Sequence, residues 1–176
     1  MKDHLRVFLL EDLRTDQELI KRQILKAAPG AVFTIASNRK EFEEKIQWGV
    51  PDIILSDYQL PDYNGLKALL YVKEKMAHIP FIFVTGQLNN EERVADTILQ
   101  GAAGYILKEN LRDLPQKIRE VVATSEAKQA AEQEQRNRQR KLQLMLQKLE
   151  TLLGEAPEFE QKEALQKTVS ELRNVN

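Results

Sequence analysis

The chain has 176 residues, of which 42% are hydrophobic and 30% are charged, and its formal net charge at pH 7 is -1. This length accommodates one full domain with an appendage or two small domains, and the balanced charge gives no reason to expect nucleic acid or an anionic membrane as a partner. The chain contains no cysteine, no signal-peptide pattern and no apolar run near the roughly 20 residues that cross a bilayer, so we expect a cytoplasmic protein without disulfide bonds.

Strand-like and helix-like segments alternate from the N-terminus. An apolar segment at Leu5–Leu10 predicts a first strand, and apolar residues at helical spacing over Asp16–Ala28 predict the helix that follows. A second strand is expected at Val32–Ile35. Asn38, followed three residues later by Glu41, resembles a capping box and predicts that a second helix begins there.

The alternation continues through the middle of the chain. Ile53–Ser56 is apolar almost throughout, which indicates a strand that is buried on both faces of a sheet. Helices are predicted at Leu66–Met76 and Glu91–Gln100, and strands at Phe81–Val84 and Gly104–Leu107. Five strand-then-helix units imply parallel strands joined by right-handed crossovers. We therefore predict an α/β fold, a doubly wound five-stranded parallel sheet with helices on both faces.

Polar residues follow four of the predicted strands. In open parallel sheets, ligand chemistry gathers at the carboxyl ends of the strands. The polar residues at these ends are, in strand order, Glu11 and Asp12, Asp57, Thr85, and Lys108. Carboxylates bind Mg²⁺ or Mn²⁺ and also accept phosphoryl groups, while a hydroxyl and an amine stabilise the transferred group. The sequence therefore predicts a metal site formed by the three carboxylates, with Asp57 as the phosphoacceptor.

Four ordered motifs carry a resemblance to a known family. Leu10–Asp12, Ser56–Gly65, Val84–Gly86 and Gly104–Lys108 together resemble the bacterial response-regulator receiver family of two-component signalling. The resemblance covers the chain from about Leu5 to Val122 and is specific because each motif follows a strand in the right order. It implies a flavodoxin-like fold and a phosphorylation switch rather than an enzyme, with a histidine kinase or a phosphotransfer protein as the phosphodonor.

The resemblance also implies roles for individual residues. The backbone carbonyl of Gln59 would join the carboxylates as a metal ligand, and Thr85 and Lys108 would contact the phosphoryl group on Asp57. Tyr105 occupies the position of the switch aromatic of the family, which turns inward when the threonine moves to meet the phosphate. A new charge would thereby bias a conformational equilibrium.

The residue after the signature lysine departs from the family pattern. The family usually has proline there, often through a cis peptide, but here Glu109 follows Lys108. A cis bond to a residue other than proline costs about 2.5–4 kcal/mol, so we expect a trans peptide and a rearranged loop. The added carboxylate would also weaken the pull of the lysine on phosphate. A pseudo-receiver scaffold that works without phosphorylation is the alternative that this departure raises.

A second phosphate-handling family uses a strand-end aspartate as its nucleophile. Haloacid-dehalogenase-like phosphatases require another aspartate two positions after that nucleophile, and this chain has Gln59 at that position. Taken alone, Asp57 would be read as a turn cap and Thr85 as an ordinary strand residue. The order of the motifs favours the receiver, and we reject the phosphatase.

The composition changes after the fifth unit, and we place a receiver domain at residues 1–124 and a helical extension at residues 125–176. Alanine, glutamine and charged residues dominate Pro115–Leu153, which predicts one long helix. Gly154–Pro157 is a stop-and-restart signal before a second, shorter helix. Apolar residues near the end of the long helix recur at steps of three and four and form an apolar stripe: Leu142, Met145, Leu149 and Leu152.

Two hypotheses describe the output of this extension. In the first, the apolar stripe is the seam of a coiled coil or a helical hairpin that forms a homodimer or docks a partner. In the second, the long helix is a signalling helix, and the chain is the N-terminal receiver fragment of a larger hybrid sensor kinase. The extension shows no helix-turn-helix signature, so we expect no DNA partner. RNA binding ranks last because the extension has no characteristic RNA-binding motif and no positive charge balance.

Overall fold

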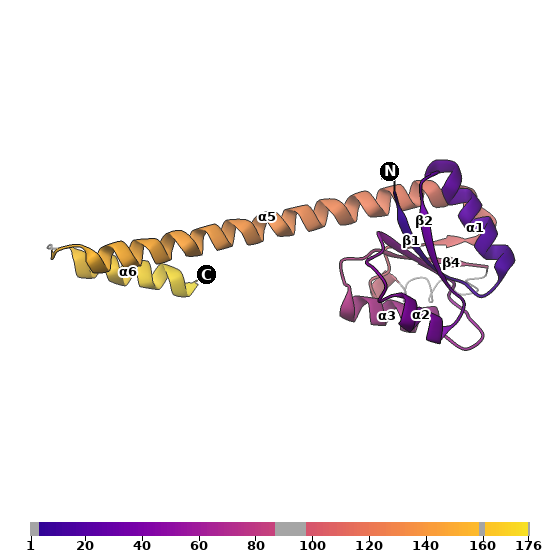
Figure 1. The fold of residues 1–176 in the computed structure, drawn as a ribbon, viewed down its shortest axis with the longest axis horizontal. Coiled ribbons are helices and arrows are strands. Elements are labelled where there is room, and N and C mark those ends of the chain that lie inside the picture. Colours follow the sequence, from indigo (N-terminus) through magenta and orange to yellow (C-terminus); the bar gives the residue numbers. More distant parts are fainter. Residues whose placement is uncertain (1–3, 87–97, 159–160, 176) are drawn as a thin grey trace. The chain divides into compact units, whose positions relative to one another are not determined.

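The computed structural model describes residues 4–86, 98–158 and 161–175 of the chain (Figure 1). Two compact units divide the chain, Met1–Glu126 and Ala127–Asn176. The division between them falls inside α5, the long helix Leu114–Glu155. The first unit carries the sheet and the residues that the sequence predicts for a site, and the second carries the end of α5 and one further helix.

The first unit is built on a parallel sheet of five strands in the order β2-β1-β3-β4-β5. The strands are β1 Arg6–Leu10, β2 Val32–Ala36, β3 Ile53–Ser56, β4 Phe81–Thr85 and β5 Gly104–Leu107. Every neighbouring pair of strands is parallel. The predicted doubly wound α/β fold is confirmed, and each strand begins and ends within one residue of its predicted bounds.

Helices cover both faces of the sheet (Figure 1). They are α1 Arg14–Ala27, α2 Arg39–Lys45, α3 Gly65–Lys75, the short 3-10 helix η1 Lys108–Asp113, and the first part of α5. Side chains of α2 and α3 pack on one face, and side chains of α1 and α5 pack on the other. The helix predicted at Glu91–Gln100 lies largely outside the described residues.

Two apolar cores result from the alternation of side chains along the strands. In β1, Val7 and Leu9 join the core under α1 and α5, whereas Phe8 and Leu10 join the core under α2 and α3. All four residues of β3 are buried, as predicted for a strand that is covered on both faces. The close packing of both cores fixes the strand ends, and therefore the residues that follow them.

Asparagine caps begin two of the helices. Asn38 Oδ1 accepts a hydrogen bond from Glu41 N at 2.9 Å, and Glu41 Oε2 accepts one from Ser37 N at 3.3 Å. The glutamate of the predicted capping box therefore returns to the residue before the cap. Asn64 Oδ1 accepts a hydrogen bond from Leu66 N at 2.7 Å and caps α3 in the same way. These caps define where the loops after β2 and β3 end.

The second unit is a helical hairpin. The helix α5 ends at Glu155, inside the predicted stop signal, and α6, Lys162–Val175, lies beside the end of α5 (Figure 1). Arg173 Nη1 lies 2.8 Å from Glu150 Oε2, so an ion pair joins the two helices. Within the described residues, each helix lacks the length of apolar sequence that would be needed to span a membrane.

The hairpin uses a different face of α5 from the one that the sequence pattern singles out. Leu146 on α5 and Val169 on α6 are 5% and 8% exposed. The four residues of the apolar stripe remain between 42% and 57% exposed. The hairpin is one of the two arrangements predicted for the extension, but the apolar stripe is not its seam.

Candidate functional site

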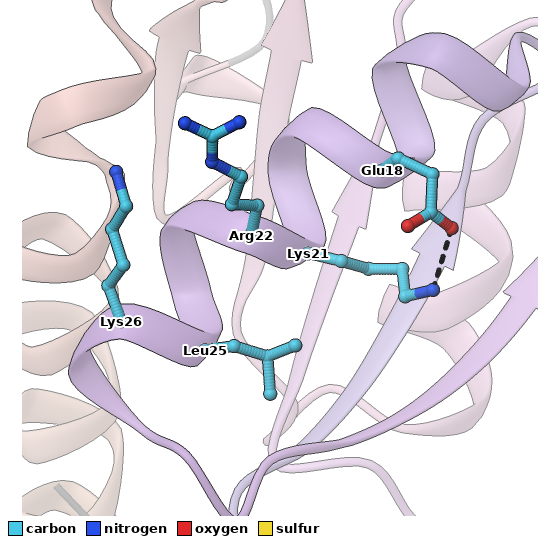
Figure 2. Close-up of a pocket in the computed structure, with 5 residues that line it drawn as sticks. All are labelled: Glu18, Lys21, Arg22, Leu25 and Lys26. Carbon is cyan, nitrogen blue, oxygen red and sulfur yellow. Dashed lines mark hydrogen bonds and ion pairs between the residues drawn. The ribbon is translucent and has the colours of Figure 1, made fainter.

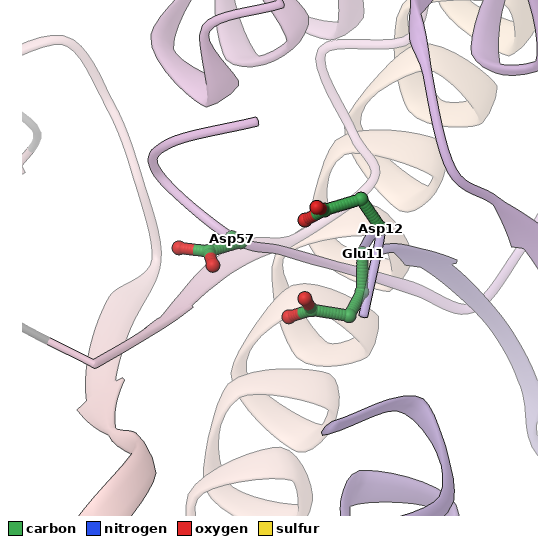
Figure 3. A group of neighbouring side chains, drawn as sticks. All are labelled: Glu11, Asp12 and Asp57. Carbon is green, nitrogen blue, oxygen red and sulfur yellow. The ribbon is translucent and has the colours of Figure 1, made fainter. Parts of the chain in front are cut away.

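The parallel register brings the ends of β1 and β3 to the same edge of the sheet. Leu10 is paired with Ser56, so Glu11 and Asp57 are the next residues on adjacent strands. The Asp57 N–H donates a hydrogen bond to the Leu10 carbonyl oxygen at 2.9 Å and fixes this alignment. One carboxylate oxygen from each of Glu11, Asp12 and Asp57 lies within 4.8 Å of the others (Figure 3). The three predicted carboxylates therefore form one cluster.

An ammonium group reaches this cluster from the end of β5. Lys108 Nζ lies 2.8 Å from Glu11 Oε2, 2.5 Å from Asp16 Oδ2 and 2.9 Å from Asp57 Oδ2. Burial by itself would lower the pKa of Lys108, but hydrogen bonds to Asp16 and Asp57 and the charge of Glu11 raise it above its usual value. The lysine is therefore held in its charged form between carboxylates.

Asp16 is a member of this arrangement that the sequence did not indicate. It lies in the first turn of α1, and its side chain is 22% exposed. An acidic residue in the first turn of a helix is usually explained by its favourable interaction with the helix N-terminus. Its closeness in sequence to the Glu11-Asp12 pair places it near the same edge of the sheet, but its contact with Lys108 depends on how α1 and η1 begin at that edge.

Both oxygens of the Asp57 carboxylate have defined partners. Oδ1 accepts hydrogen bonds from the backbone N–H groups of Tyr58 at 2.6 Å and Gln59 at 3.4 Å, and Oδ2 accepts one from Lys108. Gly65 lets the start of α3 lie directly behind this residue, because a Cβ atom at Gly65 would overlap the carbonyl oxygen of Asp57. These contacts fix the orientation of the carboxylate.

Glu11 is fully buried, and its two oxygens are unequally satisfied. Oε1 accepts a hydrogen bond from Leu13 N at 3.2 Å. Oε2 has no hydrogen-bond partner among the described residues, because Lys108 Nζ approaches it at 2.8 Å without the geometry of a hydrogen bond. Burial raises the pKa of Glu11 to about 7, since the loss of solvation outweighs the opposing effect of the lysine.

This donor set fits a divalent cation that prefers oxygen ligands. Mg²⁺ binds carboxylate and carbonyl oxygens together with water, and this edge of the sheet offers three carboxylates. Glu11 Oε2 is a buried oxygen that a bound cation would satisfy. The predicted metal ligands therefore match the chemistry of Mg²⁺ or Mn²⁺.

Comparison with protein families decides what kind of domain carries this cluster. The sequence profile of the response regulator receiver domain matches residues 7–123. This chain belongs to the response regulator receiver family. Its members act in two-component signalling as phosphoacceptor switches rather than as enzymes, and histidine kinases phosphorylate them. The match covers the sheet and every member of the carboxylate cluster.

Individual relatives agree with this assignment. The probable C4-dicarboxylate response regulator DctR of Bacillus subtilis strain 168 is 28% identical over 134 residues, which cover 74% of this chain and 59% of DctR. The nitrate/nitrite response regulator NarL of Escherichia coli K12 is 33% identical over 103 residues, 58% of this chain and 47% of NarL. The alignments therefore span about half the length of these relatives.

A solved receiver structure has the same fold. The CheY-like receiver domain protein of Methanospirillum hungatei JF-1 is 27% identical to this chain and superposes with a TM-score of 0.63. The similar region covers 70% of this chain and 98% of that structure. The receiver fold thus accounts for the first unit and leaves the C-terminal hairpin as an addition to it.

The other residues predicted for the receiver site lie at or near the same edge. Thr85 is buried and ends β4, which lies between β3 and β5, so Thr85 is between Asp57 and Lys108 along the edge. Tyr105 in β5 is 39% exposed. Gln59 lies in the loop that follows β3. The roles of these three residues stay predictions and belong to the proposal below.

The peptide bond after Lys108 is trans, as the sequence predicts. The described residues contain no cis peptide bond, so the bond between Lys108 and Glu109 is trans. The rearranged loop is the 3-10 helix η1, which begins at Lys108 itself and has non-helical backbone angles only at Asn110. Lys108 nevertheless reaches the carboxylates, so the missing proline does not remove the lysine from the site.

A shallow hollow on the outer face of α1 is a separate feature (Figure 2). Its lining comes from a single helix and comprises Glu18, Lys21, Arg22, Leu25 and Lys26. Glu18 and Lys21 pair with each other at 2.8 Å and are not available as a catalytic pair. The hollow shares no residue with the carboxylate cluster, and its chemistry is that of a solvated helix face.

Proposed function

We propose that this chain is a two-component response regulator in which Asp57 accepts a phosphoryl group from a histidine kinase or a phosphotransfer protein. The observation that carries the proposal is that the Asp57 carboxylate clusters with those of Glu11 and Asp12 and also contacts the Lys108 ammonium at 2.9 Å. A carboxylate that accepts a phosphoryl group needs a cation that neutralises its repulsion from that group. It also needs a positive group that holds the transferred phosphate. Membership of the receiver family supports the same assignment.

The chemistry follows from the contacts of Asp57. Glu11, Asp12 and Asp57, with the backbone carbonyl of Gln59, would hold Mg²⁺ or Mn²⁺, which supplies charge neutralisation toward the incoming phosphoryl group. The N–H groups of Tyr58 and Gln59 hold one oxygen and thereby orient the carboxylate. An oxygen of Asp57 then forms a bond to phosphorus while the bond from phosphorus to the donor nitrogen breaks.

The switch would follow from the new phosphoryl oxygens. Lys108 would pair with one of them, and the hydroxyl of Thr85 would donate a hydrogen bond to another. The movement of Thr85 toward the phosphate would open space for Tyr105, whose side chain is 39% exposed before the change, to turn inward. Phosphorylation would in this way shift the receiver between two conformations.

Phosphorylation of the full chain by acetyl phosphate with Mg²⁺ tests the proposal, with intact-protein mass spectrometry as the measurement. We expect the wild type to gain one phosphoryl group and Asp57→Asn to gain none. Asp62→Asn is the matched control, because Asp62 is exposed in the same loop and belongs to no carboxylate cluster. A folded, Mg²⁺-binding wild type that gains nothing would support the alternative of a phosphorylation-independent scaffold.

We also propose that the C-terminal hairpin forms a homodimer through the apolar stripe. The hairpin covers Leu146 and Val169 but leaves the stripe exposed over three turns of α5, and α6 exposes Leu165 and Leu172 as well. A second copy presents the same surface, and apolar residues at steps of three and four are self-complementary between paired helices. Two hairpins that meet in this way make a four-helix bundle.

Sedimentation of the full chain over a range of concentrations, with and without beryllofluoride, tests this second proposal. We expect a dimer that Leu149→Glu converts to a monomer. The matched control is Gln147→Glu, which adds the same charge at an exposed position of α5 outside the stripe. A wild type that stays monomeric in every condition would contradict the homodimer and favour the alternative of a receiver fragment from a larger hybrid sensor kinase.

A further inference from the structure

The ammonium group of Lys108 is paired with three carboxylates. It carries three N–H donors, and the carboxylates of Glu11, Asp16 and Asp57 all lie within 2.9 Å of Nζ. A phosphoryl group on Asp57 would require a contact from the same ammonium. The phosphoryl oxygens would therefore compete for the ammonium with the carboxylates that already contact it.

The three contacts differ in what would weaken them. Glu11 and Asp57 belong to the carboxylate cluster that fits a divalent cation, so a bound cation competes with the lysine for their oxygens. Asp16 lies outside that cluster, and its contact with Lys108 Nζ, at 2.5 Å, is the shortest of the three. The side chains of Lys108 and Asp16 are 16% and 22% exposed, so water screens their attraction only weakly.

We propose that Asp16 is a positioning residue that restrains Lys108 and slows phosphorylation of the receiver. This inference rests on the proposed role of Asp57 as the phosphoacceptor. The Asp16 carboxylate competes with phosphoryl oxygens for the ammonium, and it places a further negative charge beside an anionic phosphodonor. The four receiver motifs quoted above do not include this residue.

The rate of acetyl phosphate-dependent modification of Asp57, measured with Mg²⁺ on the full chain, tests the restraint. We expect Asp16→Asn to raise this rate about three- to tenfold, which corresponds to the loss of one charged competitor. Asp16→Glu keeps the carboxylate and should return the rate to the wild-type value. Glu18→Gln is the matched control, because it removes a charge from the same helix but pairs with Lys21 and is 71% exposed.

Labelling of Lys108 by an amine-acylating reagent, followed by peptide mass spectrometry, gives a second readout that needs no phosphorylation. We expect faster labelling in Asp16→Asn than in the wild type, because the variant removes one of the three carboxylates that stabilise the ammonium form. A phosphorylated wild type with an equal or slower rate in Asp16→Asn would overturn the restraint and leave the proposed function standing. An unmodified wild type with faster labelling in Asp16→Asn would overturn the proposed function. It would leave only the pairing of Lys108 with Asp16 standing.

Discussion

Charged side chains are buried at the carboxyl edge of the sheet, whereas apolar side chains are exposed along the C-terminal hairpin. Glu11 is fully buried and the Lys108 side chain is 16% exposed, while Leu149 and Met145 are 46% and 57% exposed. Both arrangements oppose the solvation preference of the side chains, since water favours charges and burial favours apolar groups. By the proposals above, this unfavourable solvation belongs to surfaces that act on another molecule, a cation and a phosphoryl group at the sheet edge and a second copy of the chain at the hairpin.

The largest loss of stability is expected where a buried charge loses its partner. Lys108→Met removes the common counter-charge of three carboxylates, so we expect the free energy of unfolding at pH 7 without divalent cation to fall by about 2–3 kcal/mol. Urea denaturation measures this, and added Mg²⁺ should restore part of the loss. Lys67→Met, at an exposed position of α3, should change stability by less than about 0.5 kcal/mol. Equal effects of the two variants would mean that the edge is not a buried charge cluster.

The hairpin should show the next largest loss of stability, which in a monomer is confined to its buried face. Leu146→Ala removes a side chain that is 5% exposed, and we expect it to reduce the stability of the hairpin by about 2 kcal/mol. Hydrogen exchange of the α6 amides measures that loss as reduced protection. Leu149→Ala should leave the exchange unchanged in a monomer. A matching loss of protection in Leu149→Ala would show that the apolar stripe is covered, as a homodimer requires.

A smaller change, a gain in stability, is expected when Glu11 is substituted. Glu11→Gln removes a buried charge whose Oε2 lacks a hydrogen bond, so the cation-free protein should become more stable by about 1 kcal/mol. The same change should weaken Mg²⁺ binding at least about tenfold, which calorimetric titration measures. Asp12→Asn should weaken binding without a comparable gain in stability, because Asp12 is less buried than Glu11. A Glu11→Gln variant that is less stable than the wild type would contradict the view that this carboxylate destabilises the protein until a cation binds.

The sequence predicts the sheet closely because its strands are short apolar runs between clear helix and turn signals. Ile53–Ser56 and Gly104–Leu107 match their strands at both ends. The sequence also predicts the cluster of Glu11, Asp12 and Asp57 with Lys108, because parallel strands end at the same edge and bring together residues that are distant in the chain. These predictions depend only on chain order and strand direction.

The features that the sequence missed depend on where one side chain points. The contact between Asp16 and Lys108 requires η1 to begin at Lys108 and α1 to turn over the same edge, and neither is encoded in the motif around either residue. In the extension, the spacing of the apolar stripe predicts a seam for a hairpin or a homodimer; within the hairpin α6 packs on the face of Leu146, and the homodimer seam stays a prediction. A helical pattern identifies an apolar face, and only the partner helix decides which neighbouring face is covered.

The smallest loss of stability is expected at an ion pair whose charged atoms are as close together as a pair in the site. Arg173 Nη1 and Glu150 Oε2 are 2.8 Å apart, the same distance that separates Lys108 Nζ from Glu11 Oε2. The side chains of the hairpin pair are 55% and 26% exposed, so water and salt screen their attraction, and Arg173→Gln should lower the free energy of unfolding by about 0.5 kcal/mol or less. Urea denaturation at low and high salt measures this loss, which should shrink further as salt rises. If Arg173→Gln destabilised the chain as much as Lys108→Met, the separation of the charged atoms would decide the strength of these pairs, and burial would not.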